Sequence, residues 1–96
     1  MEQKIQLKHP TGKKAVSMDN ANYELFKNYI LKNLKEKGEM SHTELLRYVS
    51  KDFKNDEVKF NGSIGWHMEW VKLDLEAKII IKRIKDKSQI KFSFIT

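Results

Sequence analysis

Histidines are the side chains in this sequence with the widest chemical range, because they can act as acids, bases or metal ligands near neutral pH. His9, His42 and His67 lie far apart in the chain, without a metal-ligand spacing such as H-E-x-x-H. Residues 62–65 read Gly-Ser-Ile-Gly, which lacks the lysine of a phosphate-binding loop and the pattern of a nucleophile elbow. We therefore expect no enzymatic activity and no metal or cofactor site, and we assign the histidines to surface or capping positions.

Positive charge is the other chemical resource of the sequence, whose net charge is +6. It gathers at the two ends, since residues 1–18 hold four lysines against one glutamate and residues 79–96 hold five basic residues against one aspartate. The basic residues of the C-terminal segment are Lys82, Arg83, Lys85, Lys87 and Lys91. Two roles stay open for them, namely contact with the phosphates of DNA and a solvated edge that prevents strands from aggregating. The N-terminal lysines Lys4, Lys8, Lys13 and Lys14 leave the same alternatives open, with the solvated edge favoured.

Length and composition predict one folded domain covering residues 1–96, because 96 residues are too few for a second core. The hydrophobic fraction of 40% and the charged fraction of 33% are typical of a globular chain with a highly charged surface. We expect no membrane span and no secretory signal, since no apolar run is long enough for either. With no cysteine in the chain, these features favour a cytoplasmic protein.

The residues that carry this chemistry must be held by regular elements. Residues 3–18 alternate in polarity on either side of a turn at 9–12, which predicts an N-terminal β-hairpin. Residues 20–36 show a helical apolar face, with Asp19 as the expected N-cap and Gly38 as the stop signal. Residues 42–53 predict a second helix, because Ser41 and Glu44 match the capping-box pattern.

The C-terminal half predicts a third helix and a second hairpin. A polar connection over 54–62 leads to a helix at about 63–78, capped by Asn61 or Ser63. Strands over 79–84 and 89–95 then flank a turn at 85–88. The division is an N-terminal hairpin at 1–18, three helices at 19–78 and a wing at 79–96. The predicted fold class is α+β, a winged helix-turn-helix with three helices and a C-terminal β-hairpin wing, preceded by the N-terminal β-hairpin.

Residues 73–84 resemble the junction of helix and wing in winged-helix proteins, where a leucine-rich helix is followed by an apolar and then basic strand. Gly65-Trp66 and residues 71–78, together with His9-Pro10 and Gly12, are similar to a family of small, functionally uncharacterised bacterial proteins. The resemblance covers most of the chain and implies the winged-helix fold, without an established activity. The sequence departs from the usual pattern at Ile79, where glycine commonly ends the helix. Because a β-branched residue is costly in the left-handed conformation, we expect this helix to end by another route.

The third helix carries two apolar stripes. Ile64, Met68, Val71 and Leu75 form the expected core stripe, and Trp66, Trp70, Leu73 and Ala77 form another on nearly the opposite side. The second stripe could be covered by the N-terminal hairpin, form a homodimer or partner interface, or stack on the bases of a single strand. The acidic side chains of Glu69, Asp74 and Glu76 and both apolar stripes argue against reading of the DNA major groove along this helix.

Two hypotheses for function follow. The first is a DNA-binding winged-helix protein that contacts phosphates through its basic wing and through Asn61, Ser63 and His67 at the start of the third helix. The second is a protein-interaction or homodimerisation module in which Trp66, Trp70 and Leu73 form the partner interface.

Overall fold

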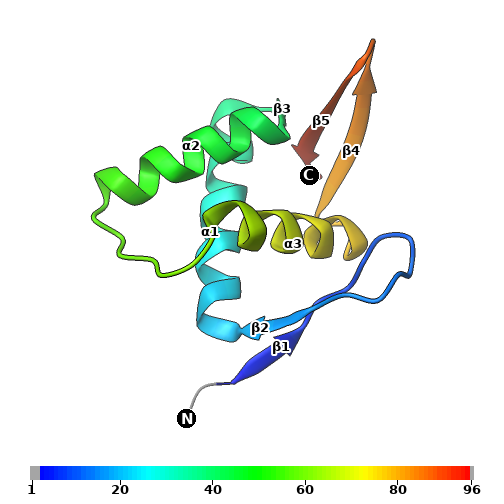
Figure 1. Ribbon diagram of the computed structural model, residues 1–96. Coiled ribbons are helices and arrows are strands. Elements are labelled where there is room, and N and C mark those ends of the chain that lie inside the picture. The colour runs from blue at the N-terminus through cyan, green and yellow to red at the C-terminus, as the bar shows by residue number, and fades with distance from the viewer. Residues whose placement is uncertain (1–2, 96) are drawn as a thin grey trace.

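The computed structural model describes residues 3–95, apart from the side chain of residue 86. Within that part the chain has an α+β fold with three helices and two small antiparallel sheets (Figure 1). The elements are β1 (Lys4–Gln6), β2 (Ser17–Asp19), α1 (Asn20–Lys37), β3 (Met40–Ser41), α2 (His42–Asn55), α3 (Ile64–Ala77), β4 (Ile81–Asp86) and β5 (Gln89–Phe94). No helix within residues 3–95 combines the length and the apolar character that a bilayer crossing needs.

The two sheets lie on different sides of the helices. Strands β1 and β2 pair at the foot of α1, with Ile5 opposite Met18. The second sheet has the strand order β3-β5-β4, and it joins Met40 to Phe92 across the short strand β3. Strand β3 was not predicted from the sequence, because two residues are too few to show an alternating pattern.

The core is formed where α1 packs against both α2 and α3. Tyr23, Phe26 and Ile30 of α1 are buried, as the helical spacing predicted. The predicted core stripe of the third helix is also confirmed at Met68, Val71 and Leu75, which are buried in α3. The buried side chains of α2 are Leu45, Val49 and Phe53. Leu7, Met18, Ile81 and Phe92 extend this core into the two sheets, so both hairpins are tied to the helices.

Helix starts follow the predicted signals with one exception. Ser41 accepts a hydrogen bond from the backbone N–H of Glu44 (3.2 Å), and the Glu44 carboxylate accepts one from Ser41 N–H (3.0 Å), which confirms the capping box. Ser63 caps α3 by accepting from Trp66 N–H at 3.0 Å. Asp19 stands at the N-cap of α1, but its side chain makes no capping hydrogen bond.

The end of α3 contradicts our expectation for Ile79. This residue does adopt the left-handed conformation, with a φ of 59°. Ile79 N–H donates to Glu76 O (3.1 Å) and Ile80 N–H donates to Leu75 O (2.9 Å), which is the Schellman pattern. Helix α2 ends in the same way, with Glu57 at a φ of 56° and Val58 N–H donating to Phe53 O (2.8 Å). The hydrogen bonds and the burial of Ile80 beside the core therefore outweigh the strain at Ile79.

The wing is also shifted from its predicted position. Strand β4 runs over Ile81–Asp86, two residues later than expected, and the turn contains only residues 87 and 88. The Schellman turn uses residues 78–80, so the strand cannot begin at Ile79. In the N-terminal hairpin, Gly12 has a φ of 80° and donates to His9 O (2.9 Å), which confirms the predicted turn.

The left-handed residue at the end of α3 generates a prediction about stability. Ile79 is 73% exposed, so Ile79→Gly removes the left-handed strain and little buried surface. We expect the free energy of unfolding to rise by about 1 kcal/mol. Urea denaturation of the two proteins measures the difference. Ala77→Gly, two residues earlier inside the helix, is the matched control and should lower stability by about 1 kcal/mol. A loss of stability in Ile79→Gly would contradict the prediction.

Candidate functional site

Helix α3 lies between the N-terminal hairpin and the wing. Lys8 N–H, in the hairpin, donates to the Asp74 carboxylate at 2.8 Å. On the other side of the helix, Arg83 of β4 donates to the Glu76 carboxylate at 3.1 Å. Residues 74 and 76 point about 200° apart on a helix, so these two contacts fix the hairpin and the wing on opposite flanks of the C-terminal half of α3.

Asp74 is the anchor of this arrangement. Its carboxylate is fully buried and accepts hydrogen bonds from Lys8 N–H, from the Tyr23 hydroxyl (2.5 Å) and from the Lys78 ammonium (2.8 Å). Burial, followed by the hydrogen bond to Asp74, raises the pKa of Tyr23 to about 12. Burial alone would lower the pKa of Lys78, but its bonds to Asp74 and Tyr23 raise it overall. Asp74 therefore does not contribute to the argument against major-groove reading, since this carboxylate points into the protein.

The second apolar stripe of α3 is divided by the hairpin. Trp70 is half-buried and packs against the core, and its ring lies 6.4 Å from the His9 ring of the hairpin. Trp66 has 44% of its surface exposed, whereas Leu73 is half-buried. Trp66 and Leu73 are seven residues apart and share one side of the helix. The hairpin therefore contacts the stripe at Trp70 and leaves Trp66 accessible.

The start of α3 is organised by a cluster of rings. The His67 ring stacks on Phe26 with 5.5 Å between centroids, and its Nδ1 lies 2.8 Å from Ser63 O. Phe60 meets the same ring edge-on at 4.8 Å. Of the residues predicted to contact phosphate here, His67 and Ser63 thus take part in the helix start, and Asn61 is exposed to solvent.

The basic residues of the wing do not form one row. The register of β4 and β5 places Lys82 and Lys91 on one face and Arg83 and Lys85 on the other, while Lys87 lies in the turn. Arg83 also lies over the Phe92 ring, 5.3 Å from its centroid, so it is held against the protein. Lys82, Lys85 and Lys87 are exposed, and the side chains that the structure describes, which exclude that of residue 86, form no ion pair with them.

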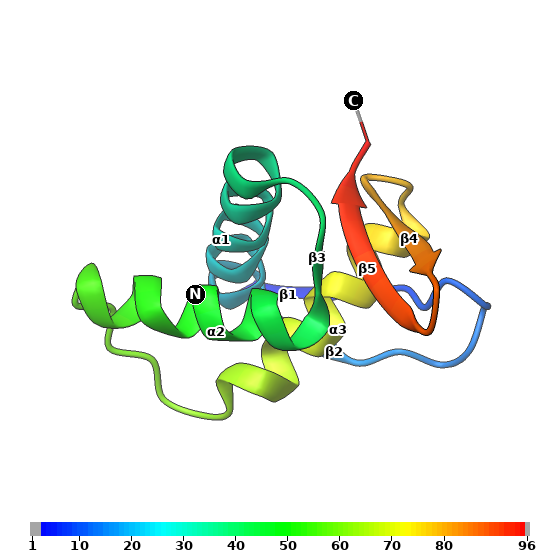
Figure 2. The same cartoon turned by 90° about the horizontal axis from the view of Figure 1, so that it is seen from above.

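The fold brings the two basic segments to the same end of α3. Figures 1 and 2 show the loop between β1 and β2 and the β4–β5 wing both beside the C-terminal end of this helix. Lys8, Lys13 and Lys14 of that loop are exposed, and they too lack an ion-pair partner in the part of the chain that the structure describes. Segments some 70 residues apart in sequence therefore contribute to one positively charged side of the molecule.

A polar cluster beneath the wing was missed by the sequence analysis. Lys72 is only 3% exposed, and its Nζ lies 2.9 Å from His42 Nδ1, 3.4 Å from the Glu69 carboxylate and 4.1 Å from the centroid of the Phe92 ring. Burial lowers the pKa of Lys72. Burial, followed by the charge of Lys72, lowers the pKa of His42. A neutral His42 accepts the Lys72 hydrogen bond, so this cluster joins the start of α2 to α3 and β5.

A cavity of about 300 Å³ between α1 and the end of α2 is a weaker candidate. Asn28, Tyr29, Lys32 and Asp56 line it. The Tyr29 hydroxyl donates to the Asp56 carboxylate at 2.6 Å, and this bond raises the pKa of Tyr29 to about 12. Two of the polar groups are therefore already paired with each other. Within residues 3–95, no group of three histidine, cysteine or acidic side chains is placed to hold a metal ion.

Fold and surfaces together define a small α+β protein with a basic side and an aromatic helix face. The chain belongs to a family of unknown function, DUF6958, whose model matches residues 4–92. No curated protein and no solved structure shows significant similarity to it.

The buried carboxylate generates a prediction about the hairpin. Asp74→Ala leaves the Tyr23 hydroxyl and Lys8 N–H without their acceptor, so we expect a loss of about 3 kcal/mol in the free energy of unfolding. The hydrogen-exchange protection of the Lys8 amide should fall as well. Glu76→Ala, two residues along the same helix, is the control and should cost about 1 kcal/mol or less. If Asp74→Ala does not fold, Tyr23→Phe tests the same cluster with a smaller loss. Equal effects of Asp74→Ala and Glu76→Ala would refute the anchor role.

The Lys72 cluster generates a prediction about pH. The pKa of His42 is below its ordinary value of 6.5 in the folded protein, so the unfolded chain binds the proton more readily. The stabilisation is therefore complete above pH 6.5 and is lost as the pH falls through the lowered pKa. We expect the wild type to lose more stability between pH 7.5 and pH 5 than His42→Gln, which keeps an acceptor for Lys72. Urea denaturation across this range measures the difference, and parallel pH profiles would rule out the role of His42.

Proposed function

We propose that this protein is a winged helix-turn-helix protein that binds nucleic acid by contacting phosphates. The element order supports this, since a helix, a short strand, two further helices and a β-hairpin follow one another in α1, β3, α2, α3 and β4–β5. The strand order β3-β5-β4 is consistent with it, because the strand after the first helix pairs with the returning strand of the wing. The DNA-binding role rests on the surface charge described above rather than on the fold.

One observation carries the proposal, namely that exposed lysines from both basic segments, with no ion pair among the described side chains, lie beside the C-terminal half of α3. Lys82, Lys85 and Lys87 come from the wing, and Lys8, Lys13 and Lys14 come from the N-terminal loop. Clustered lysines attract the phosphate backbone and release its counterions, which gives affinity without reading the sequence of bases. The N-terminal lysines, for which the sequence favoured a solvated edge, thus become candidates for the same contact surface.

The outward side of α3 argues for phosphate contact in preference to base reading along the helix. The side chain of Glu69 is 42% exposed, Trp66 is exposed near the start of the helix, and Leu73 is half-buried farther along it. A helix that reads base edges presents polar or basic side chains to the major groove. The wing and the N-terminal loop are therefore the proposed contact segments.

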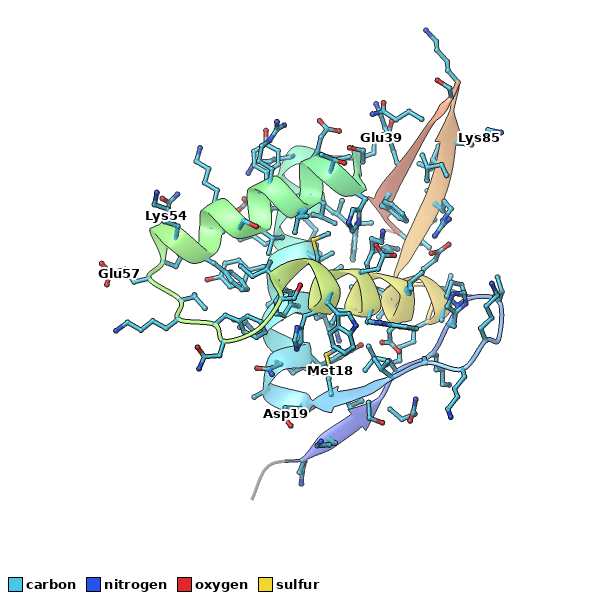
Figure 3. The ribbon with its side chains drawn as sticks, in the orientation of Figure 1. Met18, Asp19, Glu39, Lys54, Glu57 and Lys85 are labelled. Carbon is cyan, nitrogen blue, oxygen red and sulfur yellow. The ribbon has the colours of Figure 1, made fainter. Side chains whose placement is uncertain are left out.

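The proposal predicts a salt-dependent interaction that depends on particular lysines. We expect the double variant Lys85→Gln and Lys87→Gln to bind a labelled 20-base-pair duplex more weakly, with a log–log salt slope shallower by about 2. Fluorescence anisotropy from 20 to 200 mM salt measures both quantities. The charge-matched control is Lys51→Gln with Lys54→Gln on α2. Figure 3 shows Lys54 and Lys85 on opposite sides of the molecule, so this control should leave the slope unchanged.

Two outcomes would contradict this function. Absence of salt-sensitive binding to both duplex and single-stranded oligonucleotides at low salt would refute nucleic-acid binding itself. Equal losses of affinity in the two double variants would show that binding depends on total charge. That result would refute the assignment of the wing as the contact surface.

A second candidate function is a protein-interaction or homodimerisation module. The exposure of Trp66 favours it, because tryptophan is a preferred anchor in protein interfaces. Sedimentation over a range of concentrations distinguishes the two functions. A dimer that dissociates in Trp66→Ala would support the second, and a monomer at all concentrations would exclude homodimerisation.

A further inference from the structure

Trp66 combines exposure with a fixed position. It has 44% of its surface in solvent, yet its ring meets the His67 ring edge-on with 4.8 Å between centroids. His67 in turn stacks on the buried Phe26, and the backbone N–H of Trp66 donates to the Ser63 hydroxyl at 3.0 Å. The Trp66 ring is therefore preorganised in the free protein, and its side chain loses little conformational entropy when a flat group packs on it.

Positive charge lies along the helix from Trp66. Trp66 is near the start of α3 and shares its outward side with Leu73 and Ala77, which are half-buried. The hairpin is attached to the C-terminal half of that helix through Asp74, and the wing is attached to the same half through Glu76. The aromatic side chain and the two segments that carry exposed lysines thus lie at opposite ends of one helix.

This arrangement discriminates between duplex and single strand. A duplex in contact with α3 would bring Glu69 close to phosphates and place Trp66 against base edges, where it offers few matching hydrogen bonds. A single strand exposes the flat faces of its bases, and these stack on aromatic side chains whatever the sequence. Lysines along the path of the strand attract its phosphate backbone.

We infer that the surface formed by Trp66, the wing and the N-terminal loop binds single-stranded nucleic acid in preference to duplex. One base stacks on Trp66, and the phosphates that follow contact lysines of the wing and loop. Since α3 has 14 residues and is about 20 Å long, the ligand must extend over several nucleotides. This inference rests on the proposed function and names the class of nucleic acid that the same surface takes.

Binding of labelled dT15 and of a labelled 15-base-pair duplex at equal salt tests the inference. We expect tighter binding of dT15, a loss of roughly tenfold in dT15 affinity for Trp66→Ala, and near wild-type affinity for Trp66→Phe, which keeps an aromatic face. Tyr48→Ala is the matched control, because Tyr48 is a half-buried aromatic residue of α2, outside the proposed surface. It should bind dT15 as the wild type does.

Tryptophan fluorescence gives an independent readout of stacking. In a Trp70→Phe background Trp66 is the sole tryptophan, and its emission should be quenched as dT15 saturates the protein. Circular dichroism shows whether each variant is folded. If Trp70→Phe does not fold, the same titration on the wild type and on Trp66→Phe isolates the signal of Trp66 by difference.

The outcomes separate this inference from the function beneath it. Preference for duplex, or dT15 binding that is unchanged by Trp66→Ala and leaves the emission of Trp66 unaltered, would overturn the single-strand inference and leave phosphate binding standing. Failure to bind either oligonucleotide at low salt would overturn both. Equal losses for Trp66→Ala and Tyr48→Ala would show that the effect is not specific to Trp66, and stacking on this side chain would be excluded.

Discussion

The buried carboxylate of Asp74 is the interaction on which the arrangement of this protein depends. A carboxylate without water must be matched by donors, and here they come from the N-terminal loop, α1 and the end of α3 through Lys8, Tyr23 and Lys78. If one donor moves away, the charge that remains is costly, so the three segments hold their positions together. The contact of His9 with Trp70 and the position of the basic loop beside α3 follow from this constraint.

Patterns within one element were predictable from the sequence. The capping box of Ser41 and Glu44, the cap at Ser63 and the buried stripes of the helices depend on neighbours within a few residues. Contacts between distant segments were not, because periodicity assigns charged residues to solvent. Asp74 and Lys72 are both inside the protein, since partners from other elements compensate the loss of water. At Ile79, the rule against a left-handed β-branched residue failed because two backbone hydrogen bonds and the packing of Ile80 outweigh a local strain.

For the candidate surface, too, local patterns were predictable from the sequence and contacts between distant segments were not. The sequence identified two basic ends and a tryptophan stripe, but their mutual placement needed the fold. The wing lysines lie on two faces of a hairpin, and Arg83 is occupied by Glu76 and Phe92. The stripe on α3 proved to be two environments, one covered at Trp70 and one open at Trp66. Positive charge gathers beside α3, whereas the outer face of the helix is aromatic and acidic. The basic and the aromatic parts of the candidate surface therefore come from different elements.

The two-residue strand β3 has a consequence for how the molecule assembles. It pairs Met40 with Phe92, so this contact closes a segment of roughly 50 residues, whereas the pairing of β4 with β5 is local. Closing a long segment costs more chain entropy than forming a local contact. Such pairings are slow to form unless other structure brings the two ends together. Here α2 and α3 supply that structure. The β4–β5 hairpin is a local structure and does not need the helices in order to pair. Its orientation relative to the rest of the molecule is set only when the helices have packed.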